Sequence, residues 1–193
     1  MRVNVENTTL VGCLVMAAGF LMVFPCVGDS LRLHTDGESV SFVMQLFTCH
    51  LVHWTWAHLF YDVICFAALG MLLNRRELLA CFLLAALAVS STVLLFHPEL
   101  SSYCGLSGVN CALYAFFAVK VGRERNGLWG TVMIVAILLK TLAEILAGHT
   151  FFASTGFIPV HSAHLAGIIA GMLCGVLPSW GIVPCHPKKV QST

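Results

Sequence analysis

Residues 163–171 read Ala163-His-Leu-Ala-Gly-Ile-Ile-Ala-Gly171, an apolar stretch with small residues at regular intervals. Gly167, Gly171 and Gly175 recur at four-residue spacing, so they share one face of a helix. A stripe of small residues lets another membrane helix approach closely, and we expect the segment 108–121, which also has small residues on one face, to be the partner. Generic small-residue packing in a membrane bundle explains the same stripe equally well.

The composition places this stretch in a membrane protein. Of the 193 residues, 59% are hydrophobic and 10% are charged, whereas a soluble domain has about 25% charged residues. We therefore expect a polytopic membrane protein with a single membrane-embedded domain, 1–193. The net charge of +1 gives no sign of a nucleic-acid partner.

Six segments reach or approach the roughly 20 apolar residues that cross a bilayer as a helix. They are 8–27, 54–73, 77–96, 108–121, 128–147 and 160–180. The predicted fold class is all-α, a bundle of six transmembrane helices. The stretch 28–53 is expected to form an outer-side interfacial loop, and 181–193 a cytoplasmic tail.

The basic residues indicate the orientation of this bundle. With both termini in the cytoplasm, eight of the ten Lys and Arg residues fall on the cytoplasmic side, Arg32 falls on the outer side, and Lys140 lies within the fifth segment. Cytoplasmic loops of membrane proteins carry such an excess. We therefore expect a multi-pass protein of the inner (plasma) membrane.

Four polar side chains fall in apolar segments at similar depths. In this orientation His58 and Asp62 lie one and two turns below the outer surface, and Ser107 begins the fourth segment. His164 lies about 6 Å into the sixth segment, at 1.5 Å per residue. Because ionisable groups in a membrane are costly, their convergence on one layer near the outer face indicates a functional site.

The residue types in this layer suit nucleophilic catalysis. A serine hydroxyl needs a nearby base, most often histidine. Gly105 and Gly108 flank Ser107 and permit a tight turn, and the free N–H groups of a helix N-terminus favour a developing oxyanion. A serine and a histidine with an oxyanion hole, buried but reached by water from outside, describe an intramembrane serine protease. For an isolated serine, simple capping of the helix is the competing interpretation.

Three motifs together resemble the rhomboid family of intramembrane serine proteases. They are His53 with Ala57-His-Leu-Phe-Tyr-Asp62, then Gly105-Leu-Ser-Gly108, then residues 163–171. The resemblance covers nearly the whole chain. It implies that Ser107 is the nucleophile, that His164 is the general base, and that no cofactor or metal is needed.

The same resemblance suggests supporting roles for residues of the second segment. His58 and the Ser107 N–H would stabilise the oxyanion, and His53 would support the loop or the access of water. The family usually has Asn where this chain has Asp62. A carboxylate would repel an oxyanion, whereas a protonated Asp62, a form that burial favours, could donate a hydrogen bond, and both forms are left open.

A narrower resemblance, to the rhombosortase subfamily, rests on the short chain, Gly105-Leu-Ser-Gly-Val109, and the pair Lys140 and Glu144. It implies membrane-anchored substrates whose C-terminal sorting signal combines a Gly-Gly motif, a transmembrane helix and a basic tail. Lys140 and Glu144 are four residues apart and can pair on one helix face. That pair is either structural or a contact for the tail of the substrate.

Two other functions remain open. A catalytically impaired pseudoprotease that binds membrane clients is the first, and Asp62 is the reason to consider it. A membrane metal-binding oxidoreductase is the second, with His50, His53, His58, Asp62, His161 and His164 as possible ligands. The chain has no HExxH motif, and metal binding leaves the Gly105–Gly108 motif unexplained.

The nine cysteines give no disulfide framework, because the chain has no CxxC pair. Most of them lie in apolar runs, where cysteine behaves as a small hydrophobic residue. A disulfide between two of Cys26, Cys49 and Cys104, which lie outside the helix interiors, is left open.

Overall fold

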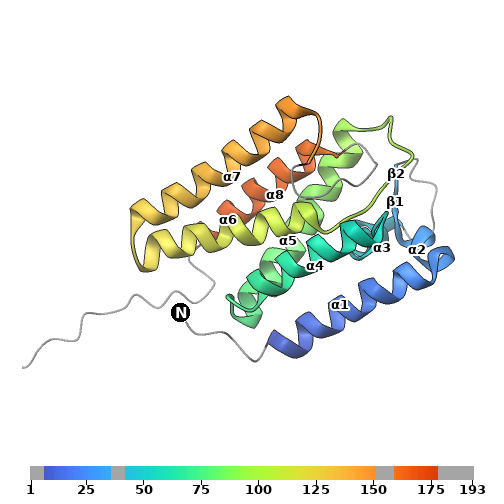
Figure 1. The fold of residues 1–193 in the computed structure, drawn as a ribbon, viewed down its shortest axis with the longest axis horizontal. Coiled ribbons are helices and arrows are strands. Elements are labelled where there is room, and N and C mark those ends of the chain that lie inside the picture. Colours follow the sequence, from blue (N-terminus) through green and yellow to red (C-terminus); the bar gives the residue numbers. More distant parts are fainter. Residues whose placement is uncertain (1–6, 36–41, 151–158, 178–193) are drawn as a thin grey trace, which may run out of the picture.

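The computed structural model describes residues 7–35, 42–150 and 159–177, and most of them are helical (Figure 1). In chain order the elements are α1 (Asn7–Val23), α2 (Pro25–Leu31), β1 (Leu33–His34), α3 (Phe42–Thr48), the 3-10 turn η1 (Cys49–Leu51), α4 (Trp56–Gly70), α5 (Arg75–Phe96), β2 (Ser102–Tyr103), α6 (Ser107–Glu124), α7 (Gly127–Ala147) and α8 (His161–Val176). The all-α character is as predicted. The tail 181–193 lies outside the described residues.

Two of these helices, α5 and α7, are long and apolar enough to cross a membrane. A third candidate is the pair α1 and α2, which passes the same test only when taken together. The helices α4 and α8 are apolar but shorter, with 15 and 16 residues. The described part of the chain is thus an apolar helical membrane protein, and the count of six crossings stays a prediction.

The first predicted segment, 8–27, is not one continuous helix. α1 ends at Val23, and the chain turns by 114° into α2. Pro25 causes the break, because its backbone has no N–H to continue the hydrogen bonds of α1 and its ring excludes the preceding turn, whereas a proline is well placed in the first turn of a new helix.

The described parts of the stretch 28–53, residues 28–35 and 42–53, form a cap over one end of the bundle. Figure 1 shows α2, α3, β1 and β2 gathered there. β1 pairs antiparallel with β2, so Leu33 lies opposite Tyr103. Gln45 on α3 is buried, and its amide donates to the Ser30 carbonyl over 3.0 Å. The cap packs beside the residues that precede α6 and therefore helps to position Ser107.

The glycines of α8 lie where that helix touches α6. A Cβ atom on Gly167 would overlap the carbonyl oxygen of Gly108, and one on Gly171 would overlap that of Ala112. A Cβ on Gly175 would lie 2.9 Å from the Cβ of Val119. Only glycine permits this approach of the two backbones, which holds the start of α8 against the start of α6.

The opposite end of the bundle carries the α4–α5 and α6–α7 connections (Figure 1). We call it the basic end, because it holds five of the seven described Lys and Arg residues: Arg75, Arg76, Lys120, Arg123 and Arg125. Glu77 is buried here. Its carboxylate accepts from Lys120 Nζ over 2.6 and 2.7 Å and from the Asn74 backbone N–H over 2.8 Å. These bonds tie α5 to α6.

Candidate active site

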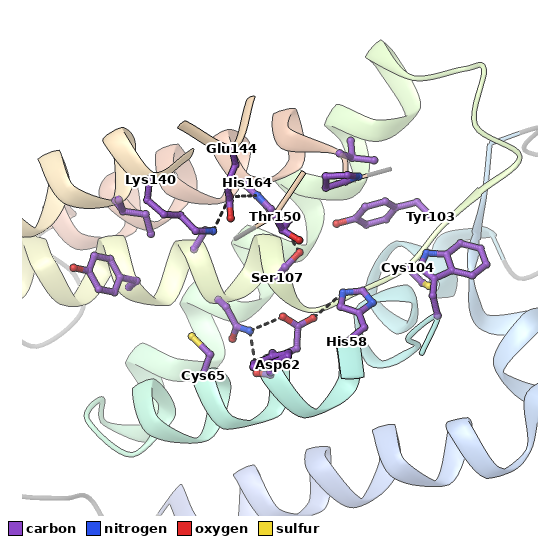
Figure 2. A pocket seen from close by; sticks show the side chains of 18 of the residues that line it. His58, Asp62, Cys65, Tyr103, Cys104, Ser107, Lys140, Glu144, Thr150 and His164 are labelled. Carbon is purple, nitrogen blue, oxygen red and sulfur yellow. Dashed lines mark hydrogen bonds and ion pairs between the residues drawn. The ribbon is translucent and has the colours of Figure 1, made fainter. Parts of the chain in front are cut away.

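Ser107 and His164 meet at the capped end of the bundle. The hydroxyl Oγ of Ser107, the first residue of α6, lies 3.0 Å from Nε2 of His164, in the first turn of α8. Figure 2 shows Ser107 between His164 on one side and Asp62 on the other. When the His164 proton is on Nδ1, the hydroxyl donates to Nε2, which is the geometry of a serine activated by a base.

The turn before Ser107 is held by its backbone. Gly105 has φ of +130°, and a Cβ there would lie 2.8 Å from the His58 ring, so the position requires glycine. Its N–H donates to the Cys49 carbonyl over 3.1 Å. Its carbonyl lies 3.1 Å from Nδ1 of the fully buried His50. Contacts from η1 thus fix the direction in which Ser107 leaves the turn.

The contacts of Asp62 favour an ionised carboxylate over a protonated donor. Its Oδ2 accepts the Leu106 N–H over 3.0 Å and lies 3.2 Å from Nε2 of both His53 and His58. Its Oδ1 accepts from the Asn110 amide over 3.3 Å. Both oxygens therefore face donors, the pattern that suits an ionised carboxylate. A negative group at the N-terminus of α6 is favourable, so Asp62 fastens the Ser107 turn to α4 rather than pointing a donor into the site.

The two expected oxyanion donors line the same cavity wall. His58 lies in the first turn of α4, where Thr55 caps the helix by accepting the His58 N–H over 3.1 Å. Ser107 begins α6, so its own N–H has no acceptor within that helix. The structure brings both groups to one cavity, and their role toward an oxyanion stays a prediction.

A cavity of about 650 Å³ opens beside Ser107 and His164. Its lining is largely apolar in area and comes from α4, α6, α7, the segment 100–104 and the start of α8. The lining also includes Tyr61, Cys65, Cys111, Tyr114 and Ile137. The cavity is large enough to hold several residues of an extended peptide, with the reactive pair in its wall.

The residues considered as metal ligands fall into separate groups. His53, His58 and Asp62 form one set whose ligand atoms lie within 4.8 Å of one another. His161 and His164 form a second set together with Glu144, and His50 belongs to neither. Each set has ligand types that can hold a metal ion, and the six possible ligands do not meet at one point.

The structure shows contacts of three side chains at the site that were not predicted from the sequence. Asn110 donates to the Asp62 backbone carbonyl over 3.0 Å, and His50 contacts the Gly105 carbonyl. Glu144 pairs with Lys140 over 2.8 Å, as their spacing predicts, but also lies 3.9 Å from Nδ1 of His164. Of these contacts, the sequence indicated only that of Asn110, which follows Ser107 by about one helical turn and so lies on the same face of the helix.

The cysteines form no disulfide among the eight that the structure describes. Cys26 is exposed, whereas Cys49 and Cys104 are buried thiols. Burial raises the pKa of Cys49 and of Cys104 to about 12. Neither thiol is ionised near neutral pH, so neither is a candidate nucleophile.

A family model described as "Rhomboid domain" matches residues 41–180. No curated protein matches the chain. The matched range includes α3 to α8 and every candidate site residue from His53 to Gly171. On this evidence the chain belongs to the rhomboid family, whose members are intramembrane serine proteases.

Proposed function

We propose that this protein is an intramembrane serine endopeptidase with Ser107 as nucleophile and His164 as general base. The observation that carries the proposal is the 3.0 Å contact between Ser107 Oγ and His164 Nε2 in the wall of a 650 Å³ cavity. Membership of the rhomboid family supports it independently.

The reaction follows from these two groups. Ser107 Oγ attacks the carbonyl carbon of the scissile peptide bond while its proton passes to His164 Nε2. The C–N bond then breaks, and His164 returns the proton to the leaving amine, which leaves an acyl-serine ester. A water molecule attacks the ester, gives a proton to His164, and releases the new carboxyl end as Ser107 regains its hydrogen. The Ser107 N–H and His58 are the proposed donors to the oxyanion.

We place the protein in the inner (plasma) membrane with six crossings, by α1, α4, α5, α6, α7 and α8. The concentration of arginine and lysine at the basic end supports a cytoplasmic location for that end and for both termini. The capped end then faces the outer side, so the bond is cut near the outer face of the bilayer.

The proposed substrate is a membrane-anchored protein with a C-terminal transmembrane sorting signal that contains a Gly-Gly motif. The resemblance of Gly105-Leu-Ser-Gly-Val109 and of the Lys140 and Glu144 pair to rhombosortases supports this choice. The cavity lining is largely apolar in area and includes Tyr61 and Cys65 of α4 and Ile137 of α7, which suits a segment that enters from the lipid. Cleavage would release the protein from its anchor.

Two alternatives make different predictions. A pseudoprotease would bind the substrate without cutting it, and the contact between Ser107 and His164 speaks against that alternative. A metalloenzyme would need an ion on one of the two ligand sets. Stoichiometric iron, copper or zinc in purified active protein would support the metalloenzyme and contradict the dyad.

The test is a co-expression assay in a bacterial host. A secreted reporter is fused to a Gly-Gly motif, an apolar helix and a basic tail, and released reporter is measured. We expect release with the wild-type protease and none with Ser107→Ala. Release that persists with Ser107→Ala would overturn the proposed mechanism. Equal release when Gly-Gly is replaced by Val-Val would overturn only the proposed substrate.

A further inference from the structure

A buried nitrogen of His164 faces a carboxylate that the proposed mechanism does not yet use. Nε2 of His164 is occupied by Ser107, whereas Nδ1 has no hydrogen-bond partner among the residues that the structure describes. The nearest charged group is Oε2 of Glu144, at 3.9 Å. His164 is only 5% exposed, and an unpaired buried N–H is costly.

Glu144 occupies an unusual position on α7. Most of that helix is exposed, and its buried residues are Gly130, Thr141 and Glu144. The Glu144 side chain is only 1% exposed. On a membrane-crossing helix, an outward-facing charged pair would lie in lipid, so an inward position is expected for Glu144. Within the bundle its carboxylate faces α8 and comes within 3.9 Å of His164 Nδ1.

The pairing of Glu144 with Lys140 keeps a charged acceptor beside His164. Lys140 Nζ lies 2.8 Å from the same Oε2 atom, and the positive charge compensates for the burial of a carboxylate. The remaining acidic residue of the site, Asp62, is already engaged by Leu106, His53 and His58. Within the described residues, Glu144 is therefore the acid at Nδ1.

We propose that Glu144 is a positioning residue that accepts the Nδ1–H of His164 and so leaves Nε2 able to take the Ser107 proton. Neutral imidazole carries one proton, and only the Nδ1–H form has an acceptor at Nε2. A carboxylate at Nδ1 fixes this form, holds the ring direction and stabilises the imidazolium that forms as the serine attacks. This inference rests on the proposed function, because it assigns a role within that reaction.

The distance is compatible with such a bond once the site is engaged. A hydrogen bond between these atoms needs about 2.9 Å, so the carboxylate must move by about 1 Å. Catalytic hydrogen bonds are often long in the absence of substrate and shorten when it binds. Glu144 lines the cavity together with His164 and is in a position to respond to an occupant.

The test uses the full chain purified in detergent and a fluorophosphonate probe. Ser107 attacks phosphorus, fluoride leaves, and the serine proton passes to His164, so labelling reports the serine and histidine pair without a known substrate. A series of probe concentrations separates the binding constant KI from the rate of the covalent step, kinact. Glu144→Gln keeps the size of the side chain but presents an amide that can donate to Nδ1 and stabilise the wrong tautomer.

We expect Glu144→Gln to lower kinact by about 100-fold, the range of a general base contribution, with KI unchanged. Glu144→Asp keeps the charge and should recover part of kinact. Glu77→Gln is the matched control: it removes the charge of another buried glutamate, and should lower the unfolding temperature while kinact stays at the wild-type value.

Three results would overturn the inference. The first is a labelled wild type with unchanged kinact in Glu144→Gln. The second is a decrease in kinact that Glu77→Gln shows equally, which would mean that both changes act through stability. The third, a wild type that the probe does not label, would overturn the proposed function as well and so is distinguishable from the other two.

Discussion

Glu77 and Glu144 are both buried glutamates with a lysine partner, but their surroundings differ. Glu77 receives hydrogen bonds from Lys120 on another helix and from the Asn74 N–H, and Asn74 in turn accepts the Glu77 N–H over 2.9 Å. This is a capping box joined to an inter-helix ion pair. It does not line the cavity described above. Glu77 therefore serves to hold α5 and α6 together.

Glu144 has a lysine partner too, but from its own helix, and it faces His164 and the cavity. The pair does not connect two helices, and its carboxylate lies beside the proposed general base. Burial and pairing alone thus do not separate a structural carboxylate from a functional one. The group that lies beside each carboxylate in addition to its lysine, Asn74 for Glu77 and His164 for Glu144, distinguishes the two roles. Variants of these residues test that distinction.

The largest change in stability is expected for Lys120→Met. It leaves the Glu77 carboxylate buried without its cation, which costs on the order of 3 kcal/mol for a broken buried pair. Chemical or thermal unfolding in detergent would measure the loss. The labelling rate per folded molecule should stay at the wild-type value, because the pair is not part of the site.

The double variant Lys120→Met and Glu77→Met is the control for Lys120→Met. Replacing both partners of a buried pair by apolar residues is often close to neutral, so stability should return toward that of the wild type. A double variant that unfolds as easily as Lys120→Met would contradict the assignment of Glu77 to a structural pair.

Asp62 gives a third buried carboxylate, and Asp62→Asn should have an intermediate effect. The NH2 group of the asparagine would face one of the donors that Asp62 now accepts from, and that hydrogen bond would be lost. We therefore expect a loss of about 1–2 kcal/mol in the free energy of unfolding. Probe labelling should be retained or should rise, because a negative charge leaves the layer where an oxyanion forms. Abolished labelling in a folded Asp62→Asn protein would show that the charge itself is required.

The smallest effect concerns pH and His50. Burial lowers the pKa of His50 below its ordinary value of 6.5, so the folded state favours the neutral ring. The unfolded chain therefore binds a proton at this ring more readily than the folded protein does. The free energy of unfolding is highest above about pH 6.5 and decreases as the pH falls below it. We expect the unfolding temperature to decrease from about pH 7 to about pH 5, and less steeply in His50→Gln. Equal slopes for the two proteins would contradict a buried neutral His50.

Much of the helical arrangement follows from apolar runs alone. The segments predicted at 77–96 and 128–147 agree closely with α5 and α7, because both are long, apolar and bounded by asparagine caps at Asn74 and Asn126. The run 8–27 did not reveal its break, since hydropathy treats the residues around Pro25 as one apolar stretch. A proline within an apolar run predicts a helix break, and Pro25 therefore indicated the bend that a hydropathy average does not detect.

For the site, the sequence predicted how deep each residue lies along its helix, but not which way each helix face points. Depth places Ser107, His164, His58 and Asp62 in one layer, and the structure brings these four together. Depth does not give the rotation of α7 about its axis, so Glu144 was seen beside Lys140 and not beside His164. The donors around Asp62 come from the turn at Leu106 and from His53, which are separated from it in sequence.

An activated serine at this site is tested most simply by labelling the purified protein with a fluorophosphonate or an isocoumarin, beside Ser107→Ala and His164→Ala. We expect the wild type to be labelled and both variants to lose labelling while they are expressed and inserted as the wild type is. Labelling of Ser107→Ala at the wild-type level, or no labelling of the folded wild-type protein, would contradict an activated serine at this site.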